Sequence, residues 1–91
     1  MMVENLKDLT RNESLMLRKL NDNYYLLVES EAYEANEIGA SIVNAVGRDL
    51  SISELCMKIA KKYSYDDVEQ IKADVENYIN FLLGEGLLIH E

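Results

Sequence analysis

The chain of 91 residues contains no proline, no tryptophan, one cysteine and one histidine. The single cysteine, Cys56, excludes a disulfide within the chain and fits a reducing cytoplasm. The lone histidine, His90, has no second imidazole to complete a metal pair, so we expect no metal and no cofactor. No apolar run approaches the roughly 18 residues of a membrane span. The acidic N-terminal stretch is not typical of a secretory signal, and we therefore expect a cytoplasmic protein.

Basic residues are also scarce, with 9 Lys and Arg against 17 Asp and Glu and a net charge of -8. Binding to phosphates depends on clustered Lys and Arg, so this balance disfavours nucleic acids and anionic membranes as partners. It is compatible with a partner of basic or mixed charge. The one basic cluster, Lys58, Lys61 and Lys62, is interpreted as a solvated face or as a contact to an acidic partner enzyme.

Apolar residues make up 48% of the chain, which at this length supports one domain with one core. Its first half contains three strand-like runs: 14–20, 24–28 and 32–35. Asn21-Asp22-Asn23 separates the first two runs and predicts a hairpin with a three-residue loop. Glu29-Ser30-Glu31 is the second break, and the short connections predict an antiparallel meander.

The second half is patterned as helix. Asn36 directly follows the third strand and is a good N-cap for a helix that we expect to end at Gly47. Ser51 and Glu54 form the pattern of a capping box for a second helix. That helix is expected to extend to about residue 63.

Asp66 with Glu69 predicts an acidic cap for a third helix, which Gly84 and Gly86 end. The apolar stripe of that helix is Val68, Ile71, Val75, Tyr78, Ile79 and Leu82. The apolar tail 87–89 is expected to fold back on the core.

The order of elements predicts an α+β fold with the shape of a winged helix-turn-helix, a three-stranded antiparallel sheet followed by three helices. Residues 1–13 are expected to be an N-terminal arm, either one amphipathic turn or a frayed end. Residues 14–91 are expected to form the domain.

The third strand is predicted to be a sheet edge, whose free N–H and C=O groups can bind a peptide by strand addition. Ala32 and Ala35 are small and leave room for the side chains of a guest. The alternative is a protected edge, because very short strands with charges such as Glu31 and Glu34 also prevent pairing.

Phe81 falls outside the apolar stripe of the last helix, on a flank with Gln70, Asp74 and Asn77. It is interpreted either as the wall of a peptide groove or as a residue that packs under the arm or the tail. In the groove interpretation, Asp74 favours a basic or hydroxyl-bearing guest residue. Apolar guest residues would contact Tyr33, Tyr78 and Phe81.

Several segments of the chain, taken in their order, form a distinctive set: Tyr33–Ile42, Ser53–Leu55, Tyr63, Asp74-Val75, Phe81-Leu82 and Gly86–Leu88. Together they resemble the PqqD-like family, in which the domain is the precursor-peptide recognition element of ribosomally synthesised, post-translationally modified peptides (RiPPs). The resemblance extends from about Leu15 to Leu88. The family usually has a large apolar residue at the position of Ala35.

The resemblance implies a binding module without catalysis, here a stand-alone leader-binding protein. A leader peptide would add as an antiparallel strand to the third strand, with its side chains in a groove beside the third helix. The protein would present the leader to a peptidase, a cyclase or a radical-SAM enzyme, in a pathway such as that of a lasso peptide. The candidate peptide-binding residues are Ala32, Tyr33, Glu34, Ala35, Gln70, Asp74, Asn77, Tyr78 and Phe81.

The sequence favours other classes of function less. Cys56 is expected to be a buried, inert thiol, and we expect no enzyme activity. A winged-helix DNA-binding regulator is the alternative function, but the last helix is rich in Asp and Glu and has only Lys72 to offset them. A structural subunit or antitoxin-like dimer is the third class. The free protein is expected to be a monomer or a weak homodimer.

Overall fold

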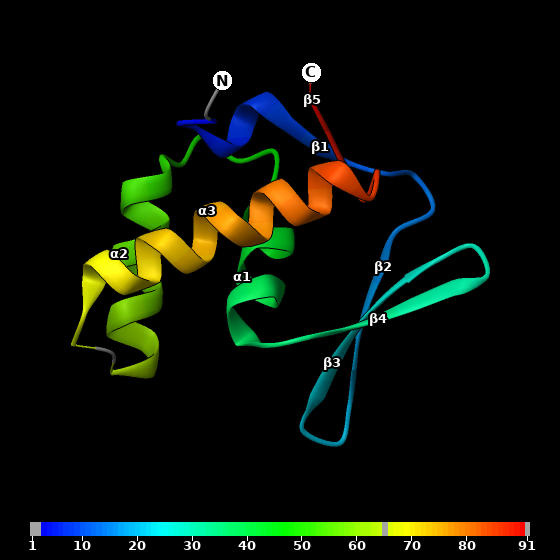
Figure 1. The fold of residues 1–91 in the computed structure, drawn as a ribbon, viewed down its shortest axis with the longest axis horizontal. Coiled ribbons are helices and arrows are strands. Elements are labelled where there is room, and N and C mark those ends of the chain that lie inside the picture. The colour runs from blue at the N-terminus through cyan, green and yellow to red at the C-terminus, as the bar shows by residue number, and fades with distance from the viewer. Residues whose placement is uncertain (1–2, 65, 91) are drawn as a thin grey trace.

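A three-stranded sheet and a group of helices on one side of it make up the molecule (Figure 1). The computed structural model describes residues 3–64 and 66–90. The elements of the two layers are β2 (Met16–Leu20), β3 (Asn23–Val28), β4 (Glu31–Ala35), α1 (Glu37–Ala45), α2 (Ile52–Tyr63) and α3 (Val68–Gly84). The predicted α+β fold, with three antiparallel strands followed by three helices, is confirmed.

The first hairpin closes through a two-residue turn, so the predicted three-residue loop is wrong. Leu20 pairs with Asn23, and only Asn21 and Asp22 remain between them. Asn21 takes a left-handed φ of 58°, which asparagine tolerates better than most residues, and the chain reverses early enough for Asn23 to join β3.

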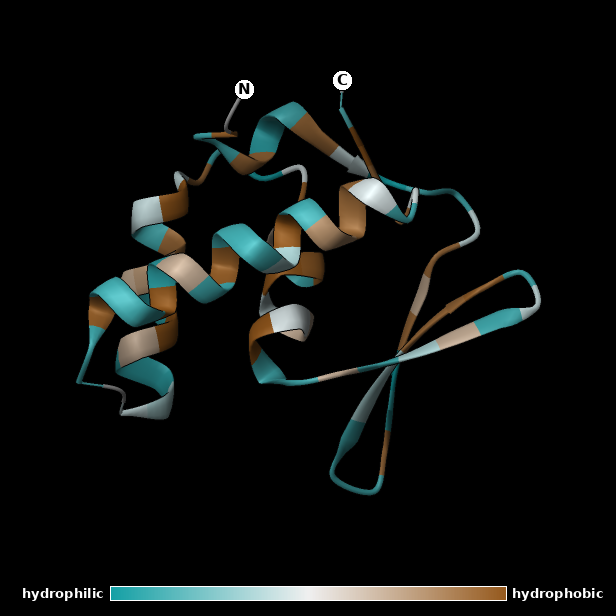
Figure 2. Ribbon diagram, viewed as in Figure 1, coloured by the Kyte–Doolittle hydropathy of each residue, from teal (hydrophilic) through white to brown (hydrophobic). Residues whose placement is uncertain are grey.

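The second hairpin is equally tight. Val28 pairs with Glu31 across the turn, and Glu29 has a φ of 51°. β4 therefore begins one residue earlier than expected, at Glu31. Polar residues occupy the tips of both hairpins (Figure 2).

A second, two-stranded sheet joins the two ends of the described chain. β1 (Leu9–Arg11) follows a short 3-10 helix, η1 (Leu6–Asp8), and pairs antiparallel with β5 (Leu88–His90). Leu6 and Leu9 are 0% exposed, and Leu88 is 1% exposed. The C-terminal tail thus folds back on the core as predicted. The division into an arm of residues 1–13 and a domain of residues 14–91 stays a prediction.

Helix caps match the sequence pattern at two of three positions. The Asn36 side chain accepts a hydrogen bond from the Gly39 N–H at 3.0 Å, and Ser51 forms a capping box with Glu54. The third cap is Asp67, which accepts from the Gln70 N–H at 3.1 Å. The prediction of Asp66 is wrong by one residue, because either of two adjacent aspartates satisfies the sequence pattern and only Asp67 immediately precedes the helix.

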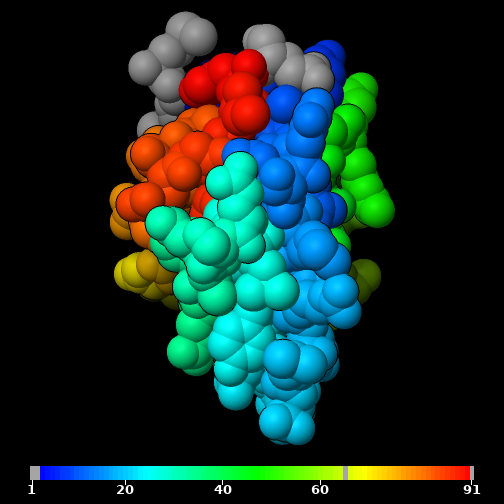
Figure 3. Space-filling view, turned by 90° about the vertical axis from the view of Figure 1, so that its right-hand side faces the viewer, coloured from blue at the N-terminus to red at the C-terminus, as the bar shows by residue number. Residues whose placement is uncertain are grey.

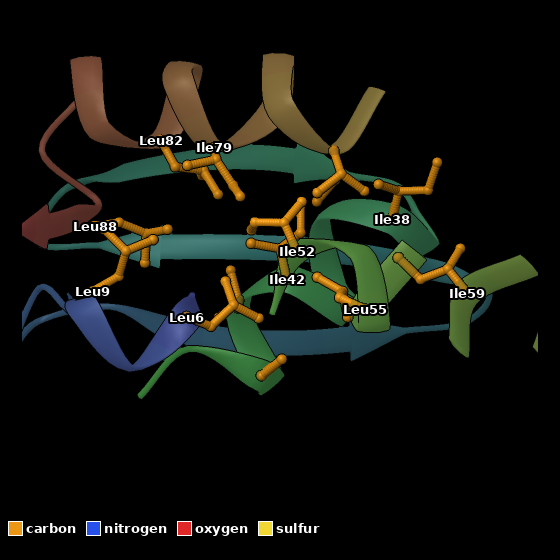
Figure 4. Packing of buried hydrophobic residues seen from close by; sticks show 14 of the residues in the cluster. Leu6, Leu9, Ile38, Ile42, Ile52, Leu55, Ile59, Ile79, Leu82 and Leu88 are labelled. Carbon is orange, nitrogen blue, oxygen red and sulfur yellow. The ribbon is translucent and has the colours of Figure 1, made fainter. Parts of the chain in front are cut away.

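One hydrophobic core lies between the sheet, the three helices and η1, and Figure 4 shows Leu6, Ile42, Leu82 and Leu88 converging in it. The stripe of α3 is buried at Ile71, Val75, Ile79 and Leu82. Val68, also a member of the predicted apolar stripe, is 42% exposed. It is the first residue of α3, and the helix begins to pack only at its next turn.

Removal of a buried N-terminal side chain should destabilise the whole protein. We expect Leu9→Ala to lower the free energy of unfolding by about 2–5 kcal/mol, because it leaves a cavity between β1 and the core. Chemical denaturation measures this. Asp8→Ala, at the exposed neighbouring position, is the control and should change stability by less than about 1 kcal/mol. Equal stability of Leu9→Ala and the native chain would show that the N-terminal segment is not part of the folding unit.

Candidate functional site

β4 is an edge of the three-stranded sheet. The strand order is β2-β3-β4, and in the described part of the chain β4 pairs only with β3. The two segments that could have covered it, β1 and β5, pair with each other in a separate sheet. Figure 3 shows the three strands side by side, with the C-terminal end of α3 next to β4. The edge therefore faces the flank of α3.

The register indicates which backbone groups of β4 point outward. In a two-residue hairpin, the pair that closes the turn is hydrogen-bonded, and the pairs alternate from there. Glu31, Tyr33 and Ala35 consequently bond to β3. The N–H and C=O groups of Ala32 and Glu34 point away from β3 and are available to a further strand.

The side chains of β4 divide between the two faces of the sheet. Successive residues point to opposite faces. Ala35 is buried and Tyr33 is half-buried against the helices, whereas Ala32 and Glu34 are exposed on the other face. Ala32 and Glu34 can thus offer a guest their backbone, and the side-chain contacts of β4 come from Tyr33 and Ala35.

Three aromatic rings connect β4 to α3. Phe81 lies between Tyr33 and Tyr78, with ring centroids 6.0 Å apart in both pairs and interplanar angles of 76° and 86°. Such edge-to-face contacts hold the rings in place. Phe81 is nevertheless 43% exposed, so it is not packed under the arm or the tail. It presents an apolar surface beside the sheet edge.

Gly39 determines where Tyr78 lies. A Cβ atom on Gly39 would be 2.4 Å from Cζ of Tyr78, so only glycine allows this approach of α1 to α3. Burial raises the pKa of Tyr78, and a hydrogen bond with the backbone of Asn36 opposes this shift. Tyr78 therefore remains a neutral phenol that joins the start of α1 to the middle of α3.

Two adjacent hollows extend along α3 from the aromatic rings. The first, of about 440 Å³, is lined by Asn36, Asp74, Asn77, Tyr78 and Phe81. The second, of about 490 Å³, shares two of these residues; its lining is Asn36, Glu37, Ile38, Asp66, Asp67, Gln70, Ile71 and Asp74. Because they share a wall, we call the pair the α3 groove. All five residues predicted on α3 line it: Gln70, Asp74, Asn77, Tyr78 and Phe81.

Hydrogen bonds hold the polar side chains of Asp74 and Asn36 in place in the middle of the α3 groove. The Gln70 side-chain amide donates to a carboxylate oxygen of Asp74 at 3.0 Å. Asn36 lines both hollows while its side chain caps α1. The sequence identified Asn36 only as a cap, because its position beside α3 depends on the packing of two helices.

Two acidic residues outside the predicted set of site residues, Glu31 and Glu85, act on Tyr33. The Tyr33 hydroxyl donates to the carboxylate of Glu31, two residues away on the same face. That hydrogen bond, with desolvation and the charges of Glu31 and Glu85, raises the pKa of Tyr33 to about 12. The two-residue spacing was a usable signal for Glu31. Glu85 could not be found, because it approaches only through the tertiary fold.

The described residues show no feature of a reactive thiol, a metal site or a membrane-spanning helix. Cys56 is 1% exposed, as expected for a buried thiol, and burial raises its pKa. Among the described residues, no group of three or more His, Cys, Asp or Glu side chains is arranged to hold a metal ion. Within 3–64 and 66–90, no helix has the length and apolar character required to cross a membrane.

An open sheet edge next to an exposed aromatic groove is the architecture of a peptide-recognition domain. Comparison with protein families agrees with this class: residues 16–88 match the family described as coenzyme PQQ synthesis protein D (PqqD). The chain belongs to the PqqD family. Proteins of this family bind precursor peptides and work with modifying enzymes. No curated protein and no solved structure matches the chain.

Gly39→Ala tests how the groove is positioned. The added Cβ must displace Tyr78, so we expect a loss of about 1–3 kcal/mol in stability and shifted NMR signals of the Tyr78 ring. Gly84→Ala is the control, because nothing lies within 4 Å of a Cβ at that position. Identical Tyr78 spectra in Gly39→Ala and the native protein would contradict the close contact.

Tyr33 should titrate abnormally. Its pKa of about 12 lies above the value of 10.0 in an unfolded chain, so its contribution to stability is present below pH 10 and is lost as the pH rises towards 12. A pH titration followed by NMR of the ring carbons measures this. Glu31→Gln should lower the pKa of Tyr33. A Tyr33 pKa that Glu31→Gln leaves unchanged would contradict the assigned cause.

Proposed function

We propose that this protein binds the leader region of a ribosomally synthesised precursor peptide by strand addition to β4. It presents the bound leader to a modifying enzyme or leader peptidase of a lasso-peptide or radical-SAM type pathway in the cytoplasm. The protein itself contributes no catalytic group. Membership of the PqqD family supports the class of ligand, and the geometry of β4 and α3 supports the mode of binding.

The observation that carries the proposal is an unpaired strand edge directly beside an exposed aromatic side chain. A guest strand can bond to the outward backbone groups of Ala32 and Glu34. Alternate side chains of that guest then face Tyr33 and Phe81. Backbone pairing supplies affinity for any extended segment, and the groove supplies selectivity.

The acidic residues of β4 do not block this edge. Glu31 accepts the hydrogen bond of Tyr33 on the helix side of the sheet. Glu34 lies on the opposite face, and by alternation its side chain projects from the sheet face and not across the edge. The interpretation of β4 as a protected edge is therefore less well supported than binding.

The charge of the last helix disfavours the DNA-binding alternative. The α3 groove is lined by acidic residues, including Asp67 and Asp74, which phosphate groups would repel. Lys72, the one basic residue of α3, lines a different depression with Glu76 and Ser51.

Titration of isotope-labelled protein with synthetic peptides tiling the leader of a precursor encoded beside this gene tests the proposal. We expect amide shifts in β4 and along α3. Phe81→Ala should weaken binding by about 1–3 kcal/mol, because Phe81 is a central apolar contact.

Met57→Ala is the matched control, since Met57 is 67% exposed on α2, away from the groove. Its affinity should equal that of the native protein. Peptide-induced shifts confined to α2 or to the β1–β5 sheet would overturn the proposed site. So would native affinity of Phe81→Ala with an intact fold.

A further inference from the structure

The α3 groove carries a concentration of negative charge. Four carboxylates line it, those of Glu37, Asp66, Asp67 and Asp74, and no Lys or Arg lines it in the described part of the chain. The N-termini of α1 and α3 also meet there. Their dipoles amount to roughly half a positive charge each, which offsets about one of the four carboxylates. The formal charge of the described lining residues stays negative.

The register locates this charge relative to a guest strand. A guest residue opposite Tyr33 points to the same face as Tyr33 and meets Phe81. A guest residue opposite Ala35 points to that face as well, about 7 Å further along, at two residues of about 3.4 Å each. It lies at the end of β4, next to Asn36. Asn36 and Asp74 both line the α3 groove there. Ala35 is small and buried, so its own side chain does not extend into the groove.

We propose, building on the function above, that this protein selects peptides with a Lys or Arg two residues before a large apolar residue. The apolar side chain packs on Phe81 and Tyr33. The cation approaches Asp74, which is half-buried and accepts only a neutral donor, the Gln70 amide, in the hydrogen bonds of the described residues.

The order of the two residues follows from strand direction. An antiparallel guest runs opposite to β4, so its residue opposite Ala35 precedes its residue opposite Tyr33. Antiparallel pairing continues the pattern of this sheet and is slightly more stable per residue than parallel pairing. The predicted signature is therefore basic, any residue, apolar, read from the N-terminus.

Selection from a displayed library of random twelve-residue peptides tests the signature without knowledge of the natural leader. The native protein, Asp74→Asn and Glu76→Gln are compared. Glu76→Gln is the control, because it makes the same change of charge on α3 but lies in a different depression. The native protein and the control should enrich the signature, and Asp74→Asn should enrich the apolar residue alone.

Synthetic peptides then measure how much the basic residue contributes to binding affinity. A selected peptide and its Lys→Gln counterpart should differ about three- to tenfold in Kd for the native protein and less than twofold for Asp74→Asn. Peptides that bind at β4 with no basic preference would overturn this inference and leave the proposed function intact. A basic preference that Asp74→Asn retains would also overturn it. A library that yields no peptide binding at β4 would overturn both.

Discussion

The structure depends on which of the five short strands pair with one another. β1 and β5 pair with each other, and in the described residues nothing pairs with the outer side of β4. Backbone N–H and C=O groups require hydrogen-bond partners, and the outward groups of Ala32 and Glu34 are accessible to water or to a guest strand. Because β4 is held on its other side by β3 and at its end by α1, those groups are fixed in strand geometry before a guest arrives. Little conformational entropy is then lost on the protein's side of the interface.

A second constraint brings specificity to the edge. Gly39 lets Tyr78 approach α1, and this contact sets α3 at a fixed position against the sheet. Phe81 lies one turn further along α3 and therefore stands beside Tyr33. The apolar contact and the carboxylate of Asp74 are thus carried by one rigid helix next to the backbone edge. Sites on rigid elements hold their geometry better than sites on loops.

The sequence was most informative where local chemistry determines structure. The capping residues Asn36 and Ser51 and the buried stripe of α3 were found because cap and periodicity signals are local. Of the predicted residues of β4 and α3, Tyr33 and Phe81 are in ring contact, and the residues predicted on α3 line one groove. The three-residue strands β1 and β5 were missed, because strands so short show no alternation and owe their existence to packing.

The site was less predictable in its details. Ala32 was predicted to shape a side-chain pocket, whereas alternation places its side chain on the opposite face and leaves its backbone for the site. Glu85 and Asn36 were missed as neighbours of Tyr33 and Asp74, because both approaches depend on how α3 lies against the sheet. Long-range packing of this kind leaves no local signal in the sequence.

The central claim is that the backbone of β4 is free until a peptide pairs with it. Amide hydrogen exchange at Ala32 and Glu34, measured with and without a saturating selected peptide, tests this most directly. The account predicts fast exchange in the free protein and strong protection in the complex, with Tyr33 protected in both. Slow exchange of Ala32 and Glu34 in the free protein, or no gain of protection in the complex, would contradict it.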